Sequence, residues 1–277
     1  MYGISIGDIA GSPYEFGPKP AEGFPLFDGT KKHMYTDDSV LTAAVCDAIL
    51  KTKDLENETE LRSRVRMSLQ QFTIDDPFRG YGSRFYTWVD RFEFMPYDSY
   101  GNGAAMRISP VAWVGKTAEE VFTLSDLCTG VTHNHPEGLK GARAVALAVF
   151  LARHCPRGNR DQDRENKDRI RKSIEQRFYR LDFTMEELKA SYAPSVTCMG
   201  TVPQAIAAFL ESDSFESAIR NAISIGGDTD TLAAMAGAIA EAYYGVPEEL
   251  KQKALSFLSP KLIRVFDAFE NCYQRSL

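Results

Sequence analysis

The stretch SIGGDTDTLAAMAGAIAEAYYG, residues 224–245, places two aspartates between a pair of glycines and an alanine-rich segment. Alanine has the highest helix propensity, so the run that begins near residue 231 predicts an α-helix. Its alanines and Gly237 allow neighbouring backbones to approach closely. The stretch therefore predicts a tightly packed, rigid helix that presents Asp228 and Asp230 at its start.

A helical period dominates the rest of the chain as well. Apolar residues recur at helical spacing in residues 37–51, 58–72, 203–212, 214–224 and 247–258. From Ala142 onward, residues 138–154 are apolar nearly all round, as a central buried helix would be. Alternating patterns rich in β-branched residues are scarce. The sequence predicts an all-α protein with many short helices joined by polar loops.

Composition and charge restrict the possible functions. Of 277 residues, 44% are hydrophobic and 25% charged, and the formal net charge is −6. An acidic protein is poorly suited to bind nucleic acid or an anionic membrane, because both require a basic surface on the protein. The run 144–152 covers about half of the ~20 apolar residues that a membrane span needs. No targeting segment is visible at the N-terminus, so we expect a cytoplasmic protein.

Five scattered cysteines form no C-x-x-C pair, which argues against a thiolate zinc site or a disulfide framework. We interpret Cys46 and Cys198 as small apolar residues within helices rather than as nucleophiles. Residues 157–178 are dense in charge and predict a solvated loop followed by an exposed helix, with an interaction arm as the alternative. Since no repeat or linker is evident, we expect one domain over residues 1–277, with a charged surface excursion near 157–180.

A second acidic cluster, YTDDSVLTAAV at residues 35–45, also stands at a predicted helix start. Thr36, Asp37, Asp38 and Ser39 are typical N-terminal capping residues, so capping alone is one interpretation. Capping explains Asp228 and Asp230 less well, because one cap residue suffices and a second carboxylate adds repulsion. Together with Thr231 they offer hard oxygen ligands, which suit Mg²⁺ or Mn²⁺. Two such turns brought together could hold two divalent ions.

Two further stretches offer polar groups to a ligand. In DSYGNGAAMRISPVAW, residues 98–113, small residues around Asn102 precede a helix expected from about Ala104. Such a turn exposes backbone N–H groups and suits a phosphate or a sugar hydroxyl. In THNHPEG, residues 132–138, His133 and His135 account for two of the four histidines in the chain.

Taken together, these motifs resemble those of the ADP-ribosylglycohydrolase family. The matching segments are GDIAGSPYEF, YTDDSVLTAAV, SYGNGAAMR, THNHPEG and residues 224–245, in the order of the family and over residues 7–245. The resemblance implies a single compact, orthogonal multi-helix domain with a cleft that binds two Mg²⁺ or Mn²⁺ ions. It implies metal ligands at Thr36, Asp37, Asp38, Asp228, Asp230 and Thr231.

The resemblance also implies roles for other residues. Glu15, Asp38 and Asp230 would be catalytic, and Asp98 is a further candidate. The diphosphate and the distal ribose would be held by a loop whose residues are Ser99, Tyr100, Gly101, Asn102 and Gly103. His133 would line the same cleft, and one of Phe92, Phe94 and Tyr97 would stack on adenine.

The implied activity is hydrolysis of the glycosidic bond between ADP-ribose and a protein side chain, with arginine favoured as acceptor. One alternative is an O-linked substrate of the serine type or O-acetyl-ADP-ribose. Others are a two-metal hydrolase of a nucleotide-like small molecule and a non-enzymatic binder of ADP-ribose. The expected partner is an ADP-ribosylated protein or an ADP-ribose-containing small molecule, and we expect a monomer with no nucleic-acid or membrane partner.

Overall fold

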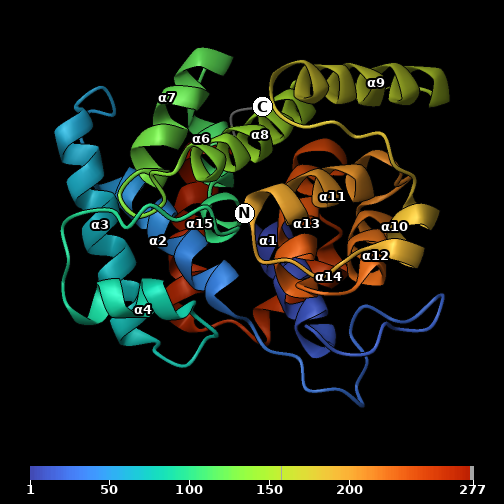
Figure 1. The fold of residues 1–277 in the computed structure, drawn as a ribbon, viewed down its shortest axis with the longest axis horizontal. Coiled ribbons are helices and arrows are strands. Elements are labelled where there is room, and N and C mark those ends of the chain that lie inside the picture. Colours follow the sequence, from blue (N-terminus) through green and yellow to red (C-terminus); the bar gives the residue numbers. More distant parts are fainter. Residues whose placement is uncertain (157, 275–277) are drawn as a thin grey trace.

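The computed structural model describes residues 1–156 and 158–274, which form one compact all-α domain without a β-strand (Figure 1). This confirms the predicted fold class. The helices in chain order are α1 Tyr2–Gly11, the 3-10 helix η1 Ser12–Tyr14, α2 Asp37–Lys51, α3 Glu58–Asp75, α4 Ser83–Asp90, α5 Gly103–Met106, α6 Ser109–Val114, α7 Ala118–Thr129, α8 Pro136–Arg153, α9 Arg160–Arg177, α10 Met185–Ser191, α11 Cys198–Leu210, α12 Phe215–Ile225, α13 Thr229–Tyr244, α14 Glu248–Leu255 and α15 Pro260–Tyr273.

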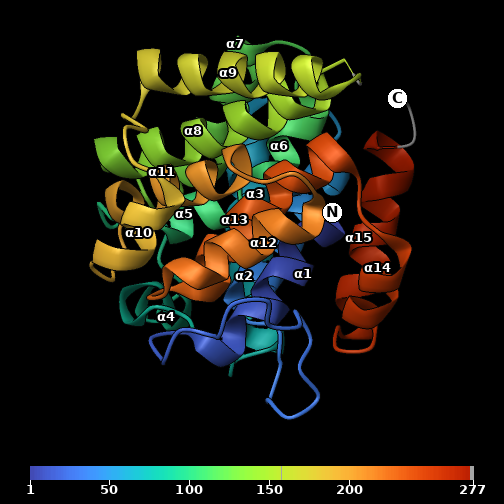
Figure 2. The same ribbon diagram turned by 90° about the vertical axis from the view of Figure 1, so that its right-hand side faces the viewer.

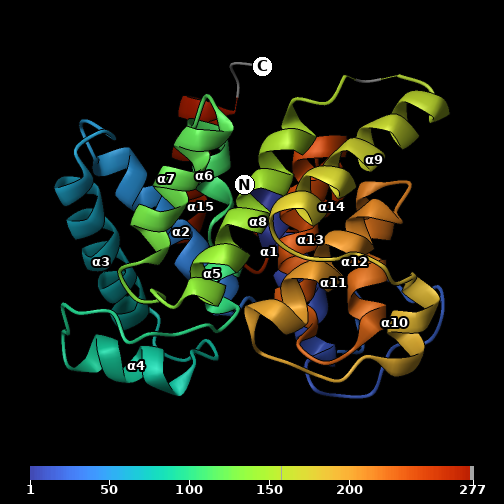
Figure 3. The ribbon, with the colours of Figure 1, turned by 45° about the horizontal axis from the view of Figure 1, so that its top comes forward.

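Helix α13, the alanine-rich segment, lies near the middle of the molecule and packs against α1, α8, α11 and α12. Figure 3 shows α2, α3 and α7 on one side of this centre and α10 and α12 on the other. Every residue of α13 from Thr229 to Glu241 is buried. The prediction of a tightly packed helix is therefore confirmed, as is the burial of α8.

The main partner of α13 is α1, a helix that the sequence patterns above did not reveal. The two helices run antiparallel with their backbones in contact. A Cβ atom added to Gly3, Gly7 or Gly11 would lie 2.4, 2.1 or 2.5 Å from a backbone oxygen of Gly237, Ala233 or Thr229, respectively. The four-residue spacing of these glycines puts them on one face of α1. Close contact over this face sets the position of every side chain in the first turn of α13.

We predict that Gly7→Ala destabilises the protein by about 3 kcal/mol, because the new methyl group would overlap the backbone of Ala233 and force the helices apart. The melting temperature should fall by roughly 10 °C. Gly29→Ala is the matched control, since a Cβ there meets no heavy atom of the described chain within 4 Å. Equal melting temperatures for the two variants, measured by circular dichroism, would contradict this account of the α1–α13 contact.

The charge-rich segment forms α9, which lies along the outer side of α8 (Figure 2). Asn159 caps its start, and Asn166, Ile170 and Ile174 are its buried residues. Residue 157, within the predicted loop, lies outside the described residues. None of the described helices is both long enough and apolar enough to cross a membrane.

Candidate metal centre and substrate cleft

A cavity of about 300 Å³ opens between the starts of α2 and α13 and the loops before α4 and α5. Its lining draws on widely separated segments of the chain. The residues predicted from the sequence that line it are Glu15, Asp37, Tyr97, Ser99, Gly101, Asn102, Gly103, His133, Asp228, Asp230 and Thr231. The structure thus gathers the acidic motifs and the glycine-rich loop around one cleft.

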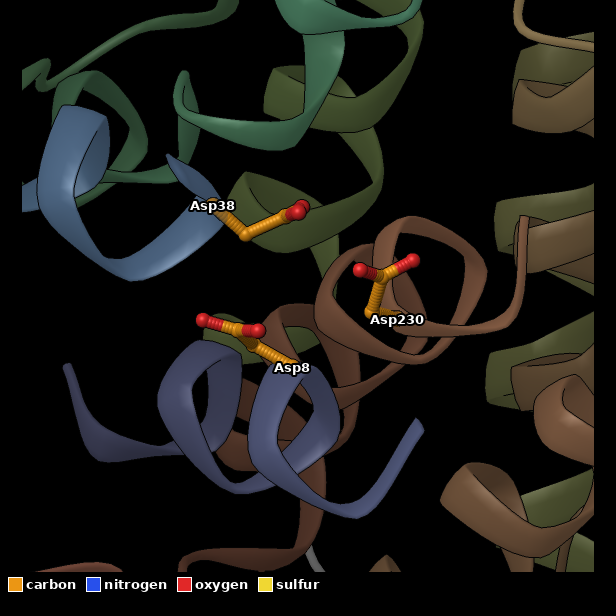
Figure 4. Close-up of side chains that lie close together, drawn as sticks. All are labelled: Asp8, Asp38 and Asp230. Atoms are coloured by element: carbon orange, nitrogen blue, oxygen red, sulfur yellow. The ribbon is translucent and has the colours of Figure 1, made fainter. Parts of the chain in front are cut away.

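Carboxylates from three helices meet beside the cleft, where Asp230 belongs to the lining and Asp8, Thr36 and Asp38 are buried behind it. Figure 4 shows Asp8 of α1, Asp38 of α2 and Asp230 of α13 pointing toward one another, with carboxylate oxygens within 4.8 Å of each other. A second group with the same spacing consists of Glu15, Asp228 and Asp230. Asp230 belongs to both groups and therefore lies at the centre of the acidic cluster.

Asp8 was not predicted from the sequence, although it lies in the matching segment GDIAGSPYEF. Its carboxylate accepts hydrogen bonds from the backbone N–H and the hydroxyl of Thr36, at 3.0 and 2.8 Å, and from the backbone N–H and the hydroxyl of Ser39, at 3.1 and 2.5 Å. These bonds fasten the start of α2 to α1. A lone aspartate in the apolar run YGISIGDIAG is the signal that could have identified it.

Thr36 caps α2, as the capping interpretation required, since its side chain accepts from the backbone N–H of Asp38. Asp38 has a different role. Its Oδ2 accepts from the hydroxyls of Thr36 and Thr231, both at 3.2 Å. Its Oδ1 is buried and has no hydrogen-bond partner among residues 1–156 and 158–274. A buried carboxylate oxygen without a partner is costly, so it fits a position beside a cation.

Asp228 occupies the N-cap position of α13 without making a side-chain capping bond to the described backbone. Its Oδ2 instead accepts a hydrogen bond of 2.7 Å from Asn102. Asp228 therefore does not cap the helix with its side chain, in agreement with the sequence argument against capping, and its carboxylate lines the cleft. The set of carboxylate and hydroxyl oxygens at this site fits a hard divalent cation.

Without a bound cation, burial and mutual repulsion disfavour the ionised forms of these carboxyl groups. Burial raises the pKa of Asp8 to about 6, against the effect of its hydrogen bonds. Burial and the charges of Asp8 and Asp228 raise the pKa of Asp37 to about 8. Burial and neighbouring carboxylates also raise the pKa of Asp38 and Asp230 well above the usual range. Cations bound there would restore the ionised forms.

These shifts predict the pH dependence of stability in metal-free protein. An unfolded aspartate has a pKa near 3.9. Above that pH the folded protein holds more protons than the unfolded chain, so the free energy of unfolding should fall as pH rises toward about 8, the pKa of Asp37. With saturating Mg²⁺ the slope should shrink or reverse, because metal competes with protons. Urea midpoints at several pH values, in EDTA and in Mg²⁺, measure both slopes, and identical slopes would contradict the prediction.

The glycine-rich loop is fixed from two sides. The Asn102 side chain donates to Asp228, and the backbone N–H of Asn102 donates to the carbonyl of Val196 at 2.9 Å. The N–H of Cys198 donates to the carbonyl of Tyr100. The expected helix after this loop is the single turn α5, followed by α6. These bonds fix the position of the loop relative to the acidic cluster.

The remaining candidates lie nearer the surface. Among the aromatic residues proposed to stack on adenine, Tyr97 lines the cleft and its ring lies 5.6 Å from that of His133. Phe92 and Phe94 are 60% and 70% exposed. Tyr100 is partly exposed and packs against the ring of His135. Asp98 is exposed, with a backbone φ of 53°, and its N–H donates to Asn134.

The chain is similar to known proteins along most of its length. The chain is 27% identical to ADP-ribosylhydrolase ARH3 of Homo sapiens, over 96% of this chain and 92% of the relative. It is 32% identical to ADP-ribosyl-[dinitrogen reductase] glycohydrolase of Rhodospirillum rubrum, over 59% of this chain and 52% of the relative. A solved structure titled ADP-ribosylglycohydrolase-related protein complex has the same fold, with a TM-score of 0.63, 20% identity and 95% coverage of both chains.

The sequence model described as ADP-ribosylglycohydrolase matches residues 1–273. This match spans nearly the whole chain, and it includes the segments that supply Asp8, Asp38 and Asp230 to the acidic cluster. The relatives are named as hydrolases or glycohydrolases. The chain therefore belongs to the ADP-ribosylglycohydrolase family and is an enzyme.

Proposed function

We propose that this protein is a metal-dependent hydrolase that cleaves the glycosidic bond between ADP-ribose and a protein side chain, with arginine as the favoured acceptor. The observation that carries the proposal is the buried carboxylate cluster around Asp230, which includes the unpartnered Oδ1 of Asp38. Carboxylates gathered this closely are best explained by bound cations.

Two Mg²⁺ or Mn²⁺ ions are the cofactors that we propose. Their ligands would come from the first turn of α2 and the first turn of α13, namely Thr36, Asp37, Asp38, Asp228, Asp230 and Thr231. Ions held there supply positive charge that orients the ribose hydroxyls and makes a nearby water more acidic. Asp8 would act through α2, since its hydrogen bonds to Thr36 and Ser39 hold the first turn in place.

Glu15 is the proposed proton carrier. It lines the mouth of the cleft, and its carboxylate lies within 4.8 Å of those of Asp228 and Asp230. Burial and the charges of Asp228 and Asp8 raise its pKa, which favours a group that can hold and release a proton. Cleavage develops oxocarbenium-like charge on the ribose, so a carboxylate beside it is stabilising. Proton transfer to the leaving group or from water would complete the reaction.

The substrate would extend from the acidic cluster along the glycine-rich loop. The proposed diphosphate and distal ribose partners are Ser99, Tyr100, Gly101, Asn102 and Gly103, with His133 behind them. The side chain of Asn102 bonds Asp228 and its backbone N–H bonds the carbonyl of Val196, so both groups would position the loop, and the substrate would contact other groups of the loop. We also propose that the active unit is a monomer.

An O-linked substrate, of the serine type or O-acetyl-ADP-ribose, is the second candidate. The relative matched over 96% of this chain bears a name that specifies no acceptor, whereas the name with a protein acceptor belongs to a match over 59%. Release of ADP-ribose should be measured in parallel on arginine-linked, serine-linked, nucleic-acid-linked and O-acetyl substrates. Turnover of the arginine-linked substrate supports the main proposal. Turnover of a nucleotide-like small molecule alone would overturn it.

A further inference from the structure

Arg107 is a charged residue at the back of the cleft that the proposed reaction does not use. It follows α5, is 1% exposed and belongs to the lining. The hydrogen bonds of its guanidinium group go to Thr132 and His133 rather than to a carboxylate. Its Nη1 is buried without a hydrogen-bond partner in the described part of the chain. A buried arginine placed in this way is costly, so its contacts identify what it does.

These contacts converge on one nitrogen of His133. Arg107 Nη2 donates to the hydroxyl of Thr132 at 2.6 Å and lies 3.4 Å from His133 Nδ1. The same hydroxyl lies 2.8 Å from Nδ1, and its other acceptor, the carbonyl of Thr129, is farther away at 3.4 Å. An arginine can only donate, so an accepting Nδ1 satisfies both contacts, whereas a proton on Nδ1 would face Nη2 without a bond.

The other ring nitrogen faces the glycine-rich loop. A Cβ atom added to Gly103 or Gly101 would lie 3.4 or 3.6 Å from His133 Nε2. A side chain at either position would therefore contact this nitrogen. With glycine at both positions, Nε2 lies beside the loop in a residue that lines the cleft.

We propose that Arg107 is a positioning residue that keeps His133 in its neutral tautomer with the proton on Nε2, so that this N–H points into the cleft as a fixed donor. The acceptor is an oxygen of the chemical class of a phosphate, and only this identification rests on the proposed function. The charged or titratable groups that face His133 are Arg107, Arg84 and Tyr97. Burial, then the charges of Arg107 and Arg84, lower the pKa of His133 well below its usual range.

Nitrogen-15 spectra of the histidine rings test the tautomer directly in the full chain without substrate. Among the signals of the four histidines, those of His133 are identified by their loss in His133→Asn, and those of His135 in the same way by His135→Asn. In the wild type, His133 should carry its proton on Nε2 and stay neutral across mildly acidic pH. His135 is the internal control, because its Nδ1 accepts from the backbone N–H of Glu137 at 3.1 Å. A proton on Nδ1 of His133 in the wild type would overturn the proposal.

Arg107→Gln should allow His133 to populate the other tautomer or to titrate at higher pH, while His135 stays unchanged. If that variant does not fold, Arg107→Lys and Thr132→Val carry the test. Arg107→Lys keeps a charge and should preserve the neutral ring in part, and Thr132→Val removes the bridging hydroxyl and should disturb the tautomer. An unchanged His133 spectrum and titration in every variant that folds would overturn the proposal.

Steady-state kinetics of these variants distinguish the loss of one hydrogen-bond donor from a general loss of rigidity in the cleft. Loss of one aligned donor to a charged ligand should weaken ADP-ribose binding and raise KM by about tenfold, with a smaller change in kcat. A fall in kcat at constant KM would contradict the assignment. Absence of any turnover by the wild type would instead count against the proposed function, and the ring spectra would still report on Arg107.

Discussion

Asp230→Asn should lower the turnover of an ADP-ribosylated substrate by about 10³-fold or more, because it removes the carboxylate shared by both acidic groups. The same change should leave the metal-free protein at least as stable as the wild type. Asp230 is buried and its pKa is raised by burial and by Asp228 and Asp38, so an ionised form at neutral pH destabilises the fold. Turnover at saturating Mg²⁺ and thermal unfolding in EDTA measure the two effects.

Asp38→Asn should behave in the same way, since Asp38 lies opposite Asp230 across the cluster (Figure 4). Asp47→Asn is the matched control on the same helix. Asp47 is buried, but it accepts hydrogen bonds from Ser68 and Lys51 away from the cleft. This control should lose about 1–3 kcal/mol of stability and keep its turnover. Unfolding of both Asp38→Asn and Asp230→Asn would favour a structural role for the cluster, and full activity of either would refute its catalytic role.

Removal of metal should weaken the binding of ADP-ribose by more than tenfold, about 2 kcal/mol or more. Bare carboxylates on the floor of the cleft repel a diphosphate, and bound divalent ions invert this local field. Arg107, whose Nη2 already donates to Thr132, is one buried cation against the several carboxylates of the cluster and should not replace the metal ions. Calorimetric titration of ADP-ribose into protein loaded with Mg²⁺ and into protein stripped of metal compares the two affinities. Turnover should fall to background after stripping and return when Mg²⁺ or Mn²⁺ is added.

Two control measurements test whether the effect on binding comes from metal at the acidic cluster. Asp230→Asn in the presence of Mg²⁺ should bind ADP-ribose as weakly as the stripped wild type, which separates loss of the cluster from an effect of the chelator. AMP lacks the ribose that would face the cluster, so its affinity should depend little on metal. Equal affinity for ADP-ribose in both wild-type forms would mean that no metal lies near the sugar. Tight binding of AMP alone would favour the small-molecule alternative.

Local sequence signals were sufficient for the helical architecture and for most of the acidic residues. The alanine-rich run after Asp230 favours an α-helix, which is α13. Threonine and aspartate before an apolar periodic segment mark the start of α2. Both signals depend only on neighbours in the chain. Because they place carboxylates at two helix starts, the candidate ligands could be named from the sequence.

The assembly of these ligands into one cluster depends on contacts between segments more than 190 residues apart. Asp8 is in the middle of an apolar helix, with no local feature of a ligand, and it joins Asp230 because Gly3, Gly7 and Gly11 let α1 lie directly on α13. The sequence likewise left Asp228 open to interpretation as a cap, and its bond to Asn102 decides otherwise. Helix propensity and capping act over a few residues and determine where helices begin, whereas the geometry of the site follows from close packing between helices, which only the tertiary structure supplies.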